Sequence, residues 1–286
     1  MKLIIAPTDF SPLADNSVRY GIEMARAMGA NLMLLNVYQL PISYSEVPLV
    51  NISLDEIRKV SEDKLTELKH NIETITGKHL QVYTESRLGD VTEELQKLSN
   101  TLHPYAIVMG TRGVTGVGRF FLGSNTMSVI KHLEVPVFII PPGATFKPFK
   151  KVGLSSDLRE VVDSTPVEHL RELVSFFNAD LHVLNVDYKQ QHFTPYTPEE
   201  TMNLESLLSG LNPVFDFIEN KDVDEGISEF AEKNNIDLII TLPKKHSILE
   251  QLFEKSATRE LIHHTRIPMM CIHHEVHEEV AKNQPS

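Results

Sequence analysis

The chain has 286 residues, enough for two domains that each bury a core, and its 41% hydrophobic and 23% charged content is that of an ordinary soluble globular protein. A net charge of −12 excludes a general nucleic-acid-binding surface, and the single cysteine, Cys271, excludes an intrachain disulfide. No apolar run reaches the length of a membrane span, and the first ten residues do not resemble a signal peptide. We therefore expect a cytoplasmic protein with neither a membrane nor a nucleic acid as partner.

Short apolar runs alternate with helical stretches along the first half of the chain. This alternation is typical of parallel strands covered on both faces by helices. One of the helices is predicted from about Ser53 to Thr76, where apolar residues recur at helical spacing. The predicted strands are Leu3–Ala6, Leu32–Val37, Leu80–Glu85, Ala106–Met109 and Val137–Ile140.

The same order of elements then begins again. "ANLMLLNV" from Ala30 matches "ADLHVLNV" from Ala179, and "VPVFII" from Val135 matches "IPMMCI" from Ile267. The second copy has a much shorter helix in its middle, around Pro198–Leu211, and a proline-rich linker, 141–150, separates the copies. The repeat is too long for a solenoid and indicates a duplicated domain. We predict two α/β domains, 1–146 and 147–280, each with a mostly five-stranded parallel sheet.

The segment "GTRGVTGVGRFFLGS", residues 110–124, contains five of the 13 glycines and leads from the fourth strand into a helix. Open parallel sheets bind ligands at the carboxyl ends of their strands, and a glycine-rich turn into a helix start offers free backbone N–H groups to phosphate. Ser124 either adds a hydroxyl donor or caps the helix. The segment is neither a P-loop nor a dinucleotide fingerprint.

The spacing of Gly110, Gly113, Gly123 and Ser124 resembles that of ATP-binding members of the universal stress protein family. The opening "PTDFS" and the ending "VPVFIIPP" strengthen the resemblance, which covers nearly all of the first copy and, in outline, the second. It implies a Rossmann-like fold, a bound adenine nucleotide (ATP, ADP or AMP) with Mg²⁺, and pairing of the last strands of the two domains. A homodimer and an unidentified protein partner are also consistent with it.

The resemblance carries over residue by residue. It implies that Asp9 accepts a hydrogen bond from the ribose or the adenine, and that Val37 contacts the adenine through its backbone. Asp9 has a second interpretation, as the cap of the helix that starts near Pro12. Asn125 departs from the small apolar residue found in many members. The full set of expected binding residues is Pro7, Thr8, Asp9, Val37, Met109, Gly110, Arg112, Gly113, Gly123, Ser124, Asn125 and Thr126.

The glycines are lost in the second copy, where Leu242, Lys245 and Lys255 replace Gly110, Gly113 and Gly123. We expect a degenerate domain retained for packing; the alternative is a pocket of different specificity that includes Asp157 and the lysines. Late in the chain, His263, His264, His273, His274 and His277 are interpreted as scattered surface residues, not metal ligands, and Cys271 as a buried strand residue.

The expected function is that of a nucleotide-dependent sensor or interaction module of the stress response. No motif places a group to activate water on the phosphate, so we expect no catalytic residues and at most slow ATP hydrolysis. Two alternatives remain: an enzyme of the adenine-nucleotide α-hydrolase group, against which the missing "SGGxDS"-like loop counts, and a scaffold that binds no nucleotide.

Overall fold

The structure is a computed structural model of the chain. It describes residues 1–39, 53–77, 79–115, 119–121, 123–188, 195–242 and 266–273, with only the backbone described at 112–115, 119–121 and 188.

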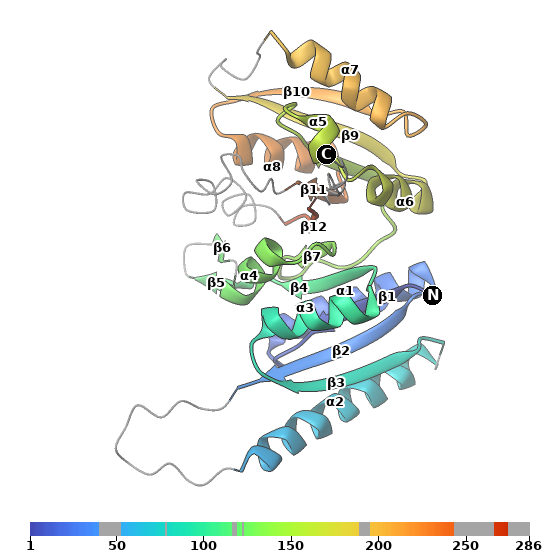
Figure 1. The fold of residues 1–286 in the computed structure, drawn as a ribbon, viewed down its shortest axis with the longest axis vertical. Helices are drawn as coiled ribbons and strands as arrows, with labels where there is room; N and C mark the ends of the chain where they lie inside the picture. The colour runs from blue at the N-terminus through green and yellow to red at the C-terminus, as the bar shows by residue number, and fades with distance from the viewer. Residues whose placement is uncertain are drawn as a thin grey trace, which may run out of the picture.

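Ten strands form one continuous sheet, in the order β10-β9-β8-β11-β12-β7-β4-β1-β2-β3 (Figure 1). The N-terminal half contributes β1 (Leu3–Pro7), β2 (Asn31–Tyr38), β3 (Val82–Leu88), β4 (Ala106–Gly110) and β7 (Val137–Ile140). The C-terminal half contributes β8 (Lys151–Ser155), β9 (Asp180–Tyr188), β10 (Val214–Asn220), β11 (Leu238–Thr241) and β12 (Met269–Cys271). Within each half all neighbouring strands of this sheet are parallel, and the strand order of one half mirrors that of the other. The predicted α/β fold class is confirmed.

The two halves join through their last strands. β7 and β12 pair antiparallel, with Met269 opposite Ile139, Met270 opposite Phe138 and Cys271 opposite Val137. These residues are at most 2% exposed. The expected pairing of Val135–Ile140 with Ile267–Ile272 within the chain is therefore observed.

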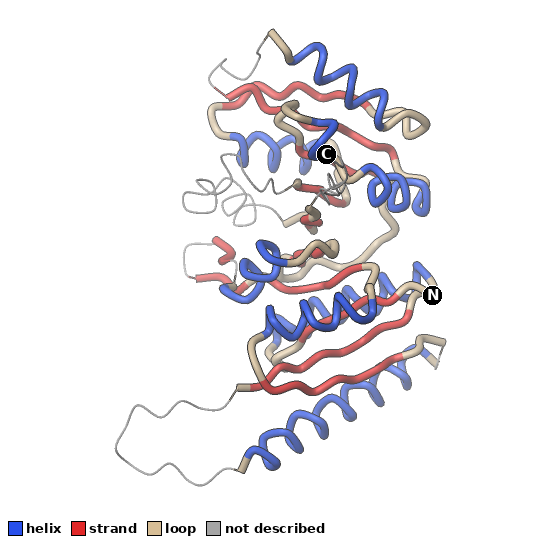
Figure 2. The backbone as a smooth tube through the Cα atoms, in the orientation of Figure 1, coloured by secondary structure: helices blue, strands red, loops and turns tan. Residues whose placement is uncertain are grey.

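Helices cover both faces of the sheet (Figure 2). In the N-terminal half they are α1 (Pro12–Met28), α2 (Leu54–Thr76), α3 (Val91–Leu102) and α4 (Ser124–His132). One core cluster lies under α1 and α2 and includes Met24 and Leu65, and another lies under α3 and α4 and includes Leu95 and Val129. Strands buried on both faces explain the continuous apolar runs in the sequence.

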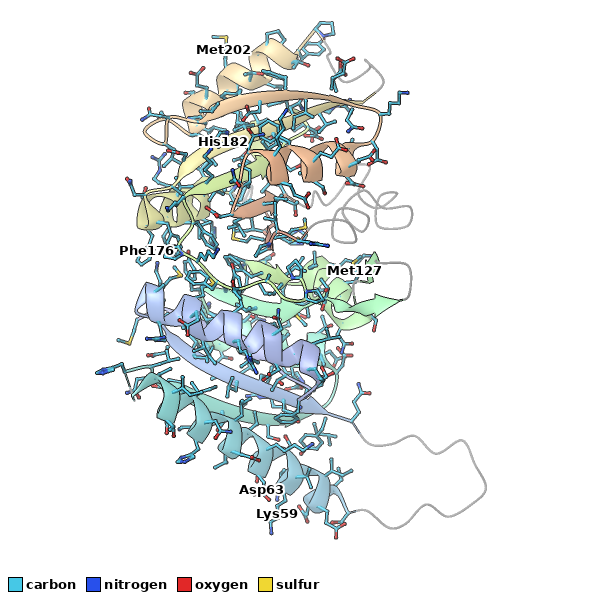
Figure 3. All side chains as sticks on the ribbon, turned by 180° about the vertical axis from the view of Figure 1, so that it is seen from behind. Lys59, Asp63, Met127, Phe176, His182 and Met202 are labelled. Carbon is cyan, nitrogen blue, oxygen red and sulfur yellow. The ribbon has the colours of Figure 1, made fainter. Side chains whose placement is uncertain are left out.

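The described helices of the C-terminal half are α5 (Val161–Ser164), α6 (Val167–Phe177), α7 (Thr197–Leu207) and α8 (Val223–Lys233). The single helix α1 thus corresponds to two shorter helices here. Pro166 lies at the break; it has no N–H to continue the helix, and Thr165 before it is extended, with φ −98° and ψ 116°. Figure 3 shows Met202 of α7 and Lys59 and Asp63 of α2 near opposite ends of the molecule.

Two local expectations need correction. Leu80 does not begin the third strand, which runs from Val82 to Leu88. The glycine segment, expected as a turn from the fourth strand into a helix, also contains two short strands, β5 (Arg112–Thr115) and β6 (Arg119–Phe121), which form a small antiparallel pair outside the main sheet.

The segment between the halves is packed, not a loose tether. Phe149 is 2% exposed, and its ring centroid lies 4.8 Å from that of Phe177 in α6. Phe146 makes an edge contact with Tyr20 of α1, with 5.3 Å between the centroids. The linker phenylalanines therefore contact helices of both halves. Lys2 adds a polar contact, with its Nζ 2.9 Å from Glu172 Oε1.

Candidate functional site

A cavity of about 240 Å³ lies at the carboxyl ends of β1 and β4 in the N-terminal half. Five segments surround it: the end of β1 with the start of α1, the end of β2, the start of α3 (Val91–Leu102), the end of β4, and the start of α4. Parallel strands end here together, which is where open sheets of this kind hold ligands. The lining residues are Pro7, Thr8, Asp9, Ser11, Leu13, Ala14, Ser17, Leu35, Val37, Val91, Met109, Gly110, Thr111, Gly123, Ser124, Asn125 and Thr126.

The turn from β1 into α1 places an exposed carboxylate at the cavity. Asp9 Oδ1 accepts from the backbone N–H of Ser11 at 2.9 Å, while Ser11 itself caps α1 by accepting from Ala14 N–H at 3.2 Å. The cap interpretation of Asp9 is therefore wrong, because Ser11 has that role. Phe10 adopts φ 63°, a left-handed conformation that turns the chain sharply and leaves Asp9 at the cavity.

A buried polar network supports this turn from below. Asn36 of β2 donates from Nδ2 to the backbone oxygen of Thr8 at 2.7 Å, and the hydroxyl of Ser61 in α2 donates to Asn36 Oδ1 at 2.7 Å. Ser61 also contacts the hydroxyl of Ser86 in β3, at 2.6 Å. Because each buried group has a partner, the position of Thr8, and with it Asp9, is tightly defined.

The start of α4 presents uncapped backbone donors to the cavity. Its N-cap is Gly123, which has no side chain to accept from the first turn, and the first intrahelical bond is from Met127 N–H to Gly123 O. α1, α2 and α3 of the same half all have a side-chain cap. Ser124 does not cap α4 but is its first residue. The first turn of α4 thus combines free N–H groups with the positive end of the helix dipole.

Packing at the end of β4 explains why residue 110 is a glycine, and the next residue, Thr111, has an unpaired hydroxyl. A Cβ on Gly110 would lie 3.2 Å from the backbone oxygen of Leu13, so close packing against α1 already favours glycine there. Thr126 of α4 donates to Gly110 O at 3.1 Å, which holds the helix start against β4. Thr111 is 4% exposed, and its buried hydroxyl has no partner among the described residues. A buried polar group of this kind calls for a ligand or water.

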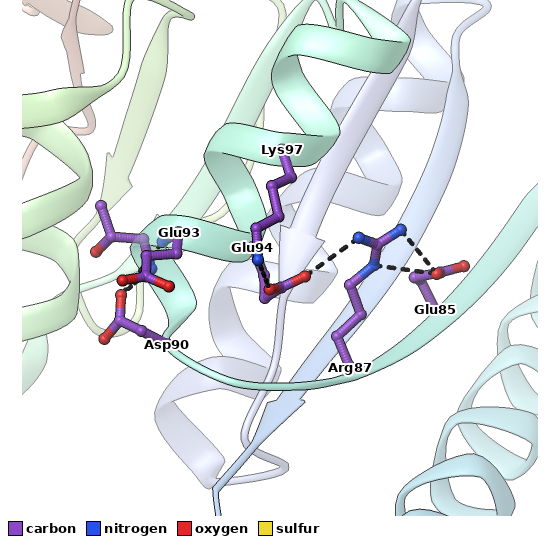
Figure 4. Close-up of polar contacts among 7 residues, drawn as sticks. Glu85, Arg87, Asp90, Glu93, Glu94 and Lys97 are labelled. Carbon is purple, nitrogen blue, oxygen red and sulfur yellow. Dashed lines mark hydrogen bonds and ion pairs between the residues drawn. The ribbon is translucent and has the colours of Figure 1, made fainter.

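The start of α3 forms another part of the cavity wall, through Val91. Asp90 caps the helix by accepting from Thr92 N–H at 2.8 Å. Glu94 contacts Lys97 and, at 3.1 Å, Arg87 of β3, which also contacts Glu85 (Figure 4). The hydrogen bond from Lys97, followed by that from Arg87, holds the pKa of the Glu94 carboxyl below its ordinary value. These contacts fix α3 against β3.

The structure brings most of the expected binding residues to this one cavity. Pro7, Thr8, Asp9, Val37, Met109, Gly110, Gly123, Ser124, Asn125 and Thr126 all line it. Arg112 and Gly113 lie in β5, where the structure describes only the backbone. Seven lining residues were missed: Ser11, Leu13, Ala14, Ser17, Leu35, Val91 and Thr111. Thr111 lies between two glycines that were selected, so its polar side chain was an available signal.

The C-terminal half repeats the turn below this site. Asn185 donates to Ser156 O at 2.9 Å, Asp157 Oδ1 accepts from Arg159 N–H at 3.2 Å, and Leu158 has φ 51°. Leu242 lies just after β11. The other replacements of the glycine segment, Lys245 and Lys255, fall outside the described residues.

Two further sequence expectations have structural outcomes. Cys271 is buried in β12, and burial raises the pKa of its thiol to about 11, so the thiolate needed for a nucleophile is disfavoured. His273, expected at the surface, is 9% exposed and lies where the halves meet, so that expectation was wrong; its four companions are outside the described residues. Within the part of the chain that is described, neither a metal-binding group of acidic, histidine or cysteine side chains nor a helix able to span a membrane is found.

Comparison with known proteins places this architecture in a family. The model of the universal stress protein family matches residues 1–141 and 162–273. The chain belongs to the universal stress protein family. It is 24% identical over 299 residues to universal stress protein Slr1230 of Synechocystis, with 94% of this chain and 99% of the relative covered.

Other members match either one half or the whole. Universal stress protein G of Shigella flexneri is 30% identical over 145 residues, which cover 49% of this chain and 98% of that protein. The crystal structure of a universal stress protein from Archaeoglobus fulgidus superposes with a TM-score of 0.73 at 20% identity, covering 96% of this chain and 98% of the other. The likeness to that structure supports the fold over nearly the entire length.

Proposed function

We propose that the N-terminal domain, residues 1–146, binds one adenine nucleotide of the ATP class, and that the domain 147–280 does not. The observation that carries the proposal is the juxtaposition at one cavity of the uncapped start of α4 and the buried, unpartnered hydroxyl of Thr111. Both supply hydrogen-bonding capacity that the described protein leaves unused, which suits the oxygens of a phosphate.

The charges of the lining orient the ligand. Asp9 is exposed at the end of β1, and a carboxylate repels phosphate but accepts hydrogen bonds from ribose hydroxyls or an adenine amine. The phosphates therefore belong at the start of α4, with Gly123, Ser124 and Thr126, and the nucleoside at Asp9 and Val37. Asp9 is the one carboxylate among the described lining residues, so Mg²⁺ would be held chiefly by the phosphates themselves, whose charge it would offset.

Nucleotide occupancy is the signal that such a domain offers to a partner. Among the lining residues that the structure describes there is neither a histidine nor a glutamate, the usual general bases, and Asp9 already accepts a backbone hydrogen bond. The chain is accordingly proposed as a nucleotide-dependent sensor or interaction module of the stress response, acting in the cytoplasm, with hydrolysis slow at most.

Calorimetric titration of the full chain, stripped of any bound ligand, with ATP, ADP and AMP in the presence and absence of Mg²⁺ tests the proposal. The expected stoichiometry is one nucleotide per chain. Two equivalent sites would contradict the assignment to one domain, and no binding would contradict the function.

The variant Thr111→Val separates a ligand role of the hydroxyl from a structural one. An unpaired buried hydroxyl costs stability, so valine should leave the thermal midpoint of the ligand-free protein unchanged or higher while it weakens nucleotide binding about two- to tenfold. Thr101→Val is the control, since that exposed hydroxyl bonds to Lys97 O in α3. If both variants bind ATP as tightly as the parent, Thr111 does not contact the ligand.

A further inference from the structure

The helix α4 extends from the cavity to the junction of the two halves. Its first residues line the cavity, and its buried residues Val129 and Ile130 belong to the same core cluster as Met269 and Cys271 of β12. Figure 3 shows Met127 of α4 near the middle of the molecule, at the level where the halves meet. A helix this short acts as one rigid body, so whatever fixes one end also fixes the other.

The far end of α4 is capped by the other half of the chain. His273, which follows β12, hydrogen-bonds through Nε2 to the backbone oxygen of Ile130. Ile130 is among the last residues of α4, where carbonyls have no intrahelical partner. With a carbonyl as acceptor, Nε2 must carry the proton and donate. A donor at this end also complements the negative end of the helix dipole.

The contact is buried, and the second ring nitrogen of His273 makes no hydrogen bond to the described residues. His273 is 9% exposed, and its Nδ1 has no partner among the described residues. Burying an unpaired ring nitrogen costs free energy, so ordinary core packing does not favour histidine at this position. The bond from Nε2 to Ile130 is the interaction that histidine gains here.

The residue equivalent to His273 in the N-terminal half cannot form such a cap. In the repeat, the residue equivalent to His273 is Pro141, which has no side-chain donor; its backbone oxygen instead accepts from Asn16 Nδ2 of α1 at 3.1 Å. The C-terminal half, which lacks the glycine segment, thus supplies a hydrogen-bond donor to α4, the helix that follows the glycine segment of the N-terminal half.

We propose that His273 is a positioning residue for the nucleotide site: by capping α4 from the C-terminal half, it holds the uncapped start of that helix in place to bind the phosphates. This inference rests on the proposed function. It also gives the C-terminal half a direct effect on ligand affinity. Thr126, bonded to Gly110 O, fixes one end of α4, and His273 fixes the other. By linkage, a bound nucleotide must stabilise the contact at His273 by the same factor.

The test is an ATP titration of the full chain and three variants. His273→Ala should weaken ATP binding about two- to tenfold, the net value of one hydrogen bond. His273→Gln, whose amide can donate in nearly the same position, should recover most of that loss. His132→Ala is the matched control, because His132 is an exposed histidine bonded to Ser128 O, at 2.8 Å, at the same end of the same helix.

A second measurement addresses the reciprocal effect. ATP should slow amide hydrogen exchange at residues 269–272 of the parent but not of His273→Ala, although these residues do not line the cavity. Phe149→Leu, which loosens the junction elsewhere, should lower the thermal midpoint without lowering ATP affinity.

The outcomes are distinguishable. If the parent binds no nucleotide, both the proposed function and this inference are contradicted. If the parent binds ATP and His273→Ala binds it equally well, only this inference is contradicted. The same holds if His273→Gln does not recover the affinity or if Phe149→Leu causes the same loss. If His273→Ala does not fold, exchange at 269–272 of the parent decides: no slowing by ATP overturns the proposal.

Discussion

The two halves of the molecule share the turn after their first strand but differ in the segment that faces it. In both, an asparagine of the second strand donates to the backbone just before the aspartate, and the residue after the aspartate is left-handed: Phe10 with φ 63° and Leu158 with φ 51°. In both, the aspartate accepts from the N–H two residues on. Only the first half retains the glycines that follow the fourth strand.

This comparison shows which features indicate a ligand. The aspartate turn recurs in the half without the glycine segment, so buried hydrogen bonds and sheet geometry are sufficient reason for it. Asp9 by itself is therefore weak evidence of nucleotide binding. The uncapped start of α4 and the unpaired Thr111 hydroxyl are stronger evidence, because folding alone does not require them.

The largest effect is expected when one half is removed. Without the C-terminal half, β7 becomes an edge strand, and its four residues, each at most 1% exposed in the whole chain, lose their cover. Such an edge is a template for pairing with another copy. Residues 1–146 expressed alone should therefore self-associate through Val135–Ile140, measured by light scattering. A stable soluble monomer would show that the junction is not needed to protect this edge.

Gly123→Val tests the feature that distinguishes the halves. Valine tolerates the backbone angles of Gly123, φ −65° and ψ 147°, so the fold should persist. Its side chain would block the approach of phosphate to the first turn of α4, and losing two or more charge-assisted hydrogen bonds should weaken binding at least about 100-fold. Calorimetry measures the affinity, and an unchanged thermal midpoint of the ligand-free variant is the control. Binding as tight as that of the parent would place the phosphates elsewhere.

How much of this could be read from the sequence depended on the range of the interactions. The strands and the repeat follow from local apolar runs and their order, and the pairing of the last strands was implied by the family resemblance. The expected binding residues line one cavity because the carboxyl ends of parallel strands meet. The bond from His273 to Ile130 joins residues 143 positions apart, and the unpaired state of Thr111 depends on everything that surrounds it. Neither has a sequence pattern. The break at Pro166 did have one, the proline itself.

Two glycines at the sheet should respond to alanine in opposite directions. A Cβ on Gly21, inside α1, would meet its nearest neighbours at 3.7 and 3.8 Å, so alanine fits and should stabilise the chain by about 0.5–1 kcal/mol through helix propensity. Gly153 of β8 replaces Ile5 of β1, and a Cβ there would lie 2.8 Å from Leu184 Cδ1, in a fully packed core. Gly153→Ala should destabilise by about 1–3 kcal/mol. Urea unfolding measures both, and equal signs would contradict the packing described for the two halves.

The smallest expected effect concerns the ion pairs of Glu94 with Lys97 and Arg87. They have no counterpart in the C-terminal half, where Gly226 replaces Glu94 and Glu219 replaces Arg87. Lys97 and Arg87 lower the pKa of Glu94 in the folded chain. The ionised carboxylate therefore stabilises the fold fully at pH values above the ordinary glutamate pKa, about 4.3. This stabilisation is lost as the pH falls from that value through the lowered pKa. Glu94→Gln should lower the urea midpoint slightly at neutral pH and leave it unchanged at strongly acid pH, so that the variant's stability depends less on pH than the parent's. Glu93→Gln, in the same helical turn but exposed, should follow the parent. If the stability of Glu94→Gln and of the parent changed with pH in the same way through the acid range, the bonds from Lys97 and Arg87 would add nothing to folding. In that case α3 is held at the cavity by its Asp90 cap and its buried leucines alone.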